Sequence, residues 1–333
     1  NLTHMGEFEM MKKTTSALAI AALLGTGAAT AATFQVDDNT TFSISGDFEL
    51  TYLETDNGTT TTDEFTDGGS EVKFGGSHVS ANGLTTSFNA ELGGFDITGD
   101  GTNNDTTSSN SETDDVTYNQ GATTNNVYIG VGGDFGTVFY GDKETAFDSL
   151  ADITDIMEEA AVTVNGTGDN QQMVQYVSPN FNGFSFVVDT MVTADDDAND
   201  GNEEFTARAD IELDMATVMV GYADINNGDG DSIGIGASFD VGPVAVGVKY
   251  QSDDDGTTTT DLAGITGSTT VGIVDVYGAI NNVDEEGADS RTELALGVGY
   301  DVADNLRVFA EMSDMDQDAG NGDITSVGAY LKF

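Results

Sequence analysis

The sequence predicts an all-β fold, a 16-stranded antiparallel transmembrane β-barrel, from three observations. Apolar and polar residues alternate with period two through almost the whole chain after residue 32. The alternating segments are about ten residues long, which suits strands that cross a membrane at a tilt, and their number is even, sixteen. Their connections alternate between long acidic and short ones, which is typical of a barrel whose two rims face different compartments.

The clearest alternating segment is 40–52, with Phe42, Ile44 and Phe48 on one face and Ser43 and Asp47 on the other. The apolar face is continuous, and the opposite face carries small or charged residues. The same pattern predicts strands at 40–53, 69–79, 84–94, 125–132, 136–143, 171–178, 183–192, 203–213, 215–224, 231–240, 243–252, 257–266, 269–281, 289–300, 305–314 and 323–333.

The connections after odd-numbered strands are long and acidic, at 54–68, 95–124, 144–170, 193–202, 225–230, 253–256, 282–288 and 315–322. Those after even-numbered strands are short, at 80–83, 133–135, 179–182, 214, 241–242, 267–268 and 301–304. A soluble β-sandwich would show the same alternation within strands. The loop asymmetry, a secretion signal and the C-terminal strand favour the barrel.

The N-terminal region has the pattern of a secretory signal peptide. Met11 and two lysines are followed by an apolar run at 17–24 and by small residues at 29–31. We interpret residues 1–10 as an upstream extension, 11–31 as the signal peptide and 32–333 as the barrel domain. The apolar run is too short to span a bilayer as a helix.

The C-terminal strand ends on an aromatic residue, with Thr325, Val327, Ala329, Leu331 and Phe333 on one face. Strands of this kind are read by the machinery that assembles outer-membrane barrels. We therefore predict that Leu331 and Phe333 form the assembly signal.

The chain has 59 acidic and 9 basic residues, a net charge of -50 and no cysteine. This charge excludes a nucleic-acid binder, which needs a basic surface, and argues against docking on anionic lipids. Low hydrophobicity with high charge can indicate disorder, but the regular alternation favours an ordered fold. Adaptation to a saline habitat remains a second explanation of the acidity.

The region most informative about function is a predicted hairpin at 125–143, which is followed in the chain by an acidic segment at 144–170. Connections of this length are usually functional, and apolar residues such as Phe147, Leu150 and Ile153 indicate that part of this one packs against other residues. The acids that we select as candidates in this segment are Glu144, Asp148, Asp152, Asp155, Glu158 and Glu159.

The run Asn126-Val127-Tyr128-Ile129-Gly130-Val131-Gly132-Gly133-Asp134-Phe135-Gly136-Thr137-Val138, followed by Tyr140-Gly141, resembles the strand, turn and strand signature of the general porins of Gram-negative outer membranes. The run Tyr176-Val177-Ser178-Pro179-Asn180-Phe181-Asn182-Gly183-Phe184 resembles the turn after their constriction loop. The resemblance covers 33–333. It implies a homotrimer of barrels in outer-membrane lipid, whose third loop folds inward and faces a basic cluster on the opposite wall.

This sequence departs from the porin family at the basic cluster, where it carries Glu71, Asn125, Asp142 and Gln175, with Lys73 and Lys143 close by. We therefore expect a weaker field across the pore and a more negative lumen. By strand parity the remaining inward cations are Lys73, Arg208, Lys249, Arg291 and Arg307. The predicted lumen wall comprises Glu71, Lys73, Asp142, Lys143, Gln175, Arg208, Lys249, Arg291 and Arg307.

The expected function is a water-filled channel for passive diffusion of small hydrophilic solutes and ions, with cations preferred because carboxylates concentrate them. The alternatives are a substrate-specific channel, a structural or adhesive barrel, and a barrel enzyme. We expect no enzyme activity, since the residues for hydrolase chemistry are missing, and no cofactor. The acidic runs 195–201 and 314–320 approach a calcium loop, but their glycine falls one place late, so they allow only weak divalent-cation binding.

Overall fold

The computed structural model describes residues 32–94, 123–160, 162–164, 169–192, 204–225, 230–315 and 322–333. The predicted signal peptide, the upstream extension and the acidic run 195–201 lie outside these residues. The described elements are β1 (Ala32–Asp37), β2 (Thr40–Asp56), β3 (Thr61–Asp67), β4 (Glu71–Val79), β5 (Thr85–Gly93), β6 (Thr123–Gly133), β7 (Gly136–Glu144), α2 (Asp148–Ala151), β8 (Asp169–Val177), β9 (Phe184–Met191), β10 (Phe205–Leu213), β11 (Ala216–Ile225), β12 (Gly230–Val241), β13 (Val244–Asp254), β14 (Thr259–Val271), β15 (Val274–Glu285), β16 (Arg291–Ala303), β17 (Leu306–Asp314) and β18 (Asp323–Lys332).

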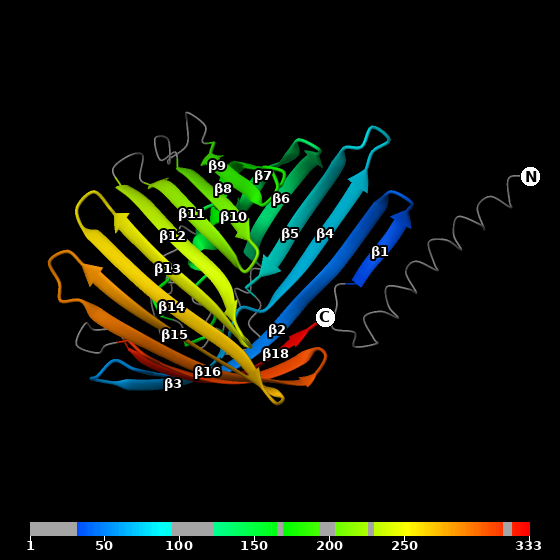
Figure 1. Cartoon of the computed structure of the whole chain (residues 1–333). Coiled ribbons are helices and arrows are strands. Elements are labelled where there is room, and N and C mark those ends of the chain that lie inside the picture. The colour runs from blue at the N-terminus through cyan, green and yellow to red at the C-terminus, as the bar shows by residue number, and fades with distance from the viewer. Residues whose placement is uncertain are drawn as a thin grey trace, which may run out of the picture.

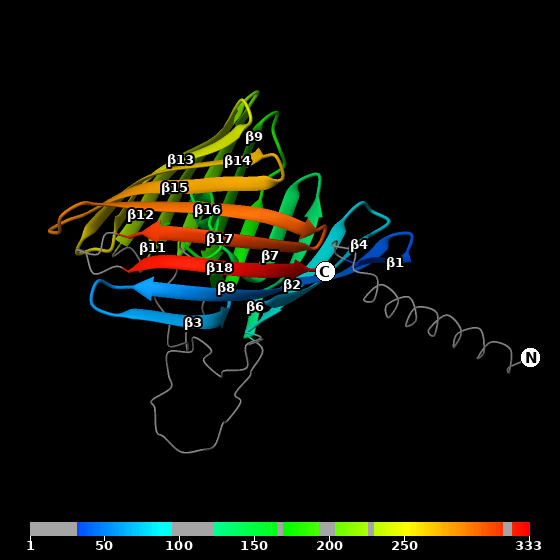
Figure 2. The same ribbon diagram turned by 90° about the horizontal axis from the view of Figure 1, so that it is seen from below.

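The strands form one antiparallel sheet that closes on itself, as a barrel (Figure 1). Neighbours in sequence pair from β4 to β18, and β18 pairs with β2 to close the ring. Eighteen strands occupy sixteen wall positions, because β3 and β4 follow each other along β2, and β18 and β1 do so on its other side. Figure 2 shows β2 between β18 and β3. The predicted 16-stranded barrel is therefore confirmed. Closure leaves few unpaired edge amides, as a sheet in lipid requires.

The wall has an apolar outer face and a polar inner face. On the outer face, a band of large apolar side chains is between 47% and 53% exposed, comprising Ile233, Ile235, Tyr250, Ile265, Ile280 and Leu296. On the inner face, Lys249, Glu293 and Glu311 are almost fully buried. A continuous exposed apolar band suits contact with lipid and would be unfavourable in water.

Two of the short strands were not predicted. β1 adds only a short stretch beside the first half of β2, and β3 lies within the predicted long connection 54–68. The residues of β3 are mostly exposed and largely polar, so neither face carries the apolar series on which the sequence prediction depends. β3 therefore extends the wall without the alternation of a lipid-facing strand.

The predicted turn at 267–268 is wrong. β14 continues through these residues to Val271, and the turn lies at Gly272, whose φ is +70°, and Ile273. A two-residue hairpin turn favours glycine in this left-handed region. The connection predicted at 301–304 is shorter, at 304–305, because β16 continues to Ala303. The remaining short connections lie within one residue of their predicted places.

The C-terminus completes the ring. Phe333 and Gly46 exchange two backbone hydrogen bonds, of 2.9 and 3.0 Å, and the Phe333 ring stacks on Phe48 at 5.7 Å between centroids. Leu331 lies on the outer face, 41% exposed. No helix among the described residues is long and apolar enough to cross a membrane.

Candidate functional site

The segment between β7 and β8 lies inside the barrel. Its described residues are 145–160 and 162–164, and we refer to them as the inner loop. Phe147 and Leu150 are fully buried against Ala223 of β11, and Met157 and Val162 pack against the wall at β15 and β16. The loop therefore follows the inner wall instead of extending into solvent.

Glycines on the inner wall provide the space for the loop. A Cβ at Gly234 would lie 2.1 Å from Leu150 Cδ2, and one at Gly236 would lie 2.3 Å from Ile153 Cδ1. Gly221 and Gly247 face the loop in the same way. Any side chain at these positions would overlap the loop, because real Cβ contacts are longer than 3 Å. Small residues on the polar face of the wall strands thus mark where the loop packs.

The inner loop has a period of three from Ala151 to Ala160. Ala151, Thr154, Met157 and Ala160 are buried, whereas Asp152, Asp155 and Glu158 are exposed. Since the buried residues face the wall, the exposed acids form one stripe toward the lumen. Asp148 and Glu159 are half-buried. Glu144, which was predicted to belong to the loop, is the last residue of β7.

The start of the inner loop is held by strands β8, β9 and β10. The Ala146 amide donates to Asp189 Oδ2 at 2.7 Å and to Thr206 Oγ1 at 3.0 Å. Gln175, which is 3% exposed, donates to the Glu144 carbonyl and to Asp189. Arg208 pairs with its neighbour Asp210 and donates to the Ala146 carbonyl at 3.2 Å.

The tip of the inner loop is held by one carboxylate, that of Glu311 on β17. It accepts hydrogen bonds of 2.9 Å from each of the amides of Glu158, Glu159 and Ala160, and one of 2.7 Å from the Tyr277 hydroxyl. Glu311 is 4% exposed. Hydrogen bonds to a charged acceptor are the strong class, so this residue is the main anchor of the tip.

The returning part of the inner loop is held by Glu293 on β16, which is fully buried. It accepts the Thr163 amide at 2.7 Å and the Thr163 hydroxyl at 2.8 Å, and it pairs with Arg291 at 2.9 Å. Lys249 donates to the Val164 carbonyl, and Asn281 donates to the Thr163 carbonyl.

The other wall residues that we predicted are also engaged. Lys73 pairs with Glu71, and with Glu91 at 3.5 Å. Arg307 pairs with Asp275 at 2.7 Å and with Asp301 at 3.2 Å. The Lys143 ammonium lies 5.3 Å from the Tyr128 ring and 5.5 Å from that of Phe139.

The remaining predicted wall acid, Asp142, lies at a bulge in β7, and its Oδ1 is buried with no hydrogen-bond partner in the described part of the chain. Asn125 belongs to β6. The predicted inward cations thus have partners. Arg208, Arg291 and Arg307 form ion pairs with carboxylates, and Lys249 donates a hydrogen bond to the inner loop.

The acids of the inner loop have raised pKa values. Burial raises the pKa of Asp152, and the nearby charges of Asp148 and Asp155 add to it. Burial is also the main cause of the raised pKa of Asp155, Glu158 and Glu159. These side chains meet the lumen, but the surrounding wall limits their hydration and so disfavours the charged form.

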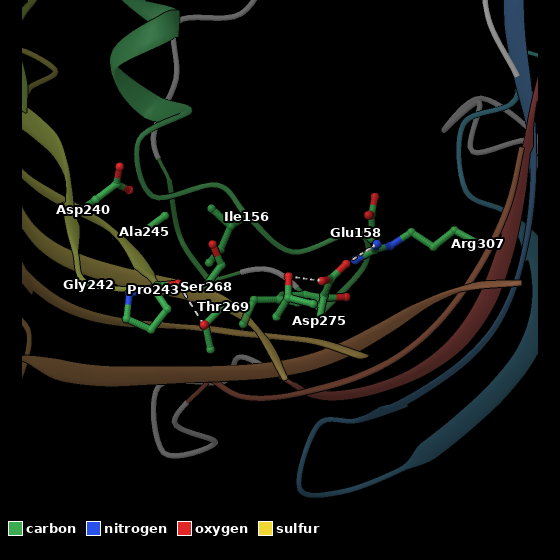
Figure 3. A pocket seen from close by; sticks show the side chains of 12 residues that line it. Ile156, Glu158, Asp240, Gly242, Pro243, Ala245, Ser268, Thr269, Asp275 and Arg307 are labelled. Atoms are coloured by element: carbon green, nitrogen blue, oxygen red, sulfur yellow. Dashed lines mark hydrogen bonds and ion pairs between the residues drawn. The ribbon is translucent and has the colours of Figure 1, made fainter. Parts of the chain in front are cut away.

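Two neighbouring hollows lie between the inner loop and the wall strands, and they share lining residues. One, of about 500 Å³, is bordered by Ile156 and Glu158 of the loop and by Tyr277, Asp275 and Arg307 of the wall (Figure 3). The other, of about 730 Å³, shares Ile156 with it and reaches the turn between β10 and β11. The smaller hollow carries polar side chains that suit water and hydrophilic solutes. The lining of the larger one includes many apolar side chains, such as Leu213, Met219 and Phe239.

The sequence analysis did not identify the anchors Asp189, Glu293 and Glu311. Glu293 alternates with Thr292 and Leu294 and so falls on the polar face of its strand, but nothing in the sequence says which inward acid meets the loop. Among the described residues there is no group of three or more His, Cys, Asp or Glu side chains that could hold a metal ion.

A closed barrel with an apolar outer band, a polar lumen and an inner loop that narrows it defines a membrane channel. The sequence matches the family of Gram-negative porins over residues 14–320, and the chain belongs to this family. It is therefore an outer-membrane protein that forms a channel for small solutes.

Two curated relatives come from the genus Halomonas. A "Monosaccharide porin" from Halomonas sp and the "Major outer membrane protein" of Halomonas elongata are each 24% identical, over 97% of this chain and 100% of theirs. Among solved structures, mutants of the Rhodopseudomonas blastica porin superpose with TM-scores of 0.68 and 0.69 at 17% identity, covering 88% of this chain and 100% of theirs. At this sequence identity, the similarity to the Rhodopseudomonas blastica porin shows a shared fold.

Proposed function

We propose that this porin passes small hydrophilic solutes and ions by passive diffusion and prefers cations over anions. The observation that carries the proposal is the unequal state of the charges around the inner loop. Asp152, Asp155 and Glu158 are exposed to the lumen, whereas Arg208, Arg291 and Arg307 are paired with carboxylates. Unpaired carboxylates concentrate cations and repel anions.

Changing the loop acids to amides tests this preference. In a variant with Asp152→Asn, Asp155→Asn and Glu158→Gln, we expect the cation-to-anion permeability ratio to fall several-fold, because three charges leave the narrow part of the lumen. The measurement is the reversal potential of single channels in a KCl gradient. A matched control removes three exposed acids in or beside the long connections predicted at 253–256 and 282–288, namely Asp255, Asp284 and Asp289. An equal fall in both variants would mean that the inner loop does not control selectivity.

Acidification is expected to weaken the cation preference at a higher pH than ordinary carboxyls would require. The pKa values of Asp152, Asp155, Glu158 and Glu159 are raised. These acids are charged above their pKa, so their charge is lost as pH falls through values above about 4, the ordinary range. Reversal potentials measured against pH give the midpoint. Asp255→Asn is the control, because turn hydrogen bonds lower the pKa of Asp255, and it should leave the midpoint unchanged.

We further propose that the barrel works as a homotrimer in outer-membrane lipid, that Leu331 and Phe333 are read by the barrel-assembly machinery, and that the protein has neither enzyme activity nor a cofactor. The position of Phe333 supports the assembly role, since its backbone closes the ring at Gly46. Cross-linking in native membranes tests the trimer. Deletion of Phe333 tests the signal, and normal insertion of that variant would contradict it.

Passage of monosaccharides is a second candidate, favoured by the name of one Halomonas relative. The hollow of about 500 Å³ offers the hydroxyls of Ser268 and Thr269 and the carboxylate of Asp275, beside the Tyr277 ring. Swelling of liposomes in isotonic sugar solutions tests it. Equal permeability for monosaccharides and for similar-sized polar solutes would leave the channel non-specific.

A further inference from the structure

The break between β3 and β4 creates a gap in the inner wall. β2 pairs with β4 up to Asp47 and with β3 from Leu50 onward, so Glu49 of β2 lies opposite residues 68–70, which belong to neither strand. Hydrogen bonds fix this gap. Asp67 Oδ1 accepts the Gly69 amide at 2.9 Å and the Ser70 amide at 2.6 Å, and Ser70 Oγ accepts the Glu49 amide at 2.9 Å.

The tip of the inner loop enters this gap and brings two carboxyl groups together. A Cβ at Gly68 would lie 2.4 Å from Glu159 Oε1 and 2.5 Å from Glu49 Cδ, so both groups occupy the space that this glycine leaves. Glu49 is 9% exposed. The Oε1 atoms of both residues are buried, and neither has a hydrogen-bond partner among the described residues.

The surroundings of the pair offer oxygen atoms and negative charge. Thr51 is fully buried, and its Oγ1 makes no hydrogen bond within the described residues. It nevertheless lies close enough to Glu159 to favour the ionised carboxyl. The charged groups that act most strongly on the pair are acidic, namely Glu158, Asp47, Asp67 and Glu311.

Two buried carboxylates that lie beside the same small space repel each other unless a cation or a shared proton lies between them. Oxygen-only ligands select hard cations, and a charge of two matches a divalent ion. Ca²⁺ accepts six to eight oxygens in flexible geometry and tolerates water among them. Two carboxylates, a hydroxyl and water suit Ca²⁺ better than Mg²⁺, which needs near-ideal octahedral geometry.

We propose that Glu49 and Glu159 bind one divalent cation of the Ca²⁺ class, with Thr51 as a third oxygen ligand, and that this ion joins the tip of the inner loop to β2. The site is separate from the exposed acids Asp152 and Asp155, and it does not depend on the ion preference of the channel. With few protein ligands its affinity is weak, on the order of 0.1–1 mM.

The test is Ca²⁺ titration of the purified, EDTA-treated porin in detergent at neutral pH and constant ionic strength. The measurement is hydrogen exchange of the peptide that contains the amides of Glu158, Glu159 and Ala160. We expect saturable slowing by Ca²⁺ in the native protein. In Glu49→Gln and in Glu159→Gln, half-saturation should need about tenfold more Ca²⁺ or more, since affinity follows the number of charged ligands. Glu159 lies outside the wall strands, so its variant keeps the barrel intact.

Asp284→Asn is the control, because Asp284 is an exposed acid near the end of β15 that belongs neither to the gap nor to the inner loop, and its response to Ca²⁺ should equal that of the native protein. The proposal is overturned if Ca²⁺ leaves the native exchange unchanged, or if both glutamine variants respond as the native protein does. An infrared band of a protonated carboxyl at neutral pH, absent in Glu49→Gln and insensitive to Ca²⁺, would show a shared proton in place of the ion.

Discussion

Replacing Glu311 with glutamine is expected to release the tip of the inner loop and to produce transient closures of the channel. The carboxylate accepts three loop amides and the Tyr277 hydroxyl. A glutamine keeps the volume but turns one acceptor into a donor that faces other donors. Leaving buried donors unpaired costs about 2 kcal/mol, which is roughly a 30-fold change in the ratio of docked to released loop.

Single-channel recordings measure this effect as increased open-channel noise and a lower mean conductance, because a released loop moves within the lumen. Hydrogen exchange in the loop should rise in parallel. Glu285→Gln is the control, since Glu285 lies at the exposed end of β15, and it should behave as the native protein. Recordings from Glu311→Gln with native noise and native exchange would mean that the apolar contacts alone hold the tip.

Replacing Gly234 with valine is expected to push the inner loop off the wall. A Cβ at this position would lie only 2.1 Å from Leu150 Cδ2, and the fully buried Leu150 belongs to the cluster that holds the loop on β11. Overpacking and loss of these contacts cost about 3 kcal/mol or more. Valine suits a β-strand, so the barrel should still form while the displaced loop narrows the lumen.

The matched control is Gly267→Ala, whose new Cβ would make ordinary van der Waals contacts with Val244 Cγ1 at 3.8 Å and with the Ala245 carbonyl oxygen at 3.9 Å. It should leave conductance unchanged. In a second control, Leu150→Ala is combined with Gly234→Val to make room for the new side chain, and the double variant should recover part of the native conductance. If Gly234→Val and the native protein have equal conductance, the glycines of the wall do not determine where the inner loop packs.

The strands were predictable from sequence because lipid on one side and water on the other impose alternation on each of them. The prediction was wrong where that constraint is absent. β3 is exposed and polar on both faces, and the turn at Gly272 is flanked by Val271 and Val274, which continue the apolar series. Neither position differs from its neighbours in a way that a period-two pattern detects.

The two faces of the inner loop were also predictable, since an acidic segment with apolar residues at intervals has one face to bury and one to expose. The role of its exposed acids in the pore stays a prediction. The partners of the loop on the wall were not predictable. Glu293 and Glu311 are among many acids at inward positions, and only the path of the loop determines that these two receive its amides. The gap at Glu49 requires in addition the break after Asp67, which no pattern in the sequence indicates.

The positions of the two main anchors in the chain set the order in which the channel can be completed. The contact from Glu158 to Glu311 spans 153 residues, and that from Thr163 to Glu293 spans 130. Contacts this distant along the chain are slow to form, because a large loop must close before they stabilise anything. The tip and return of the inner loop can therefore dock only after β16 and β17 have joined the sheet. A barrel intermediate without its C-terminal strands therefore lacks both anchors, although the strands that hold the start of the loop precede them in the chain.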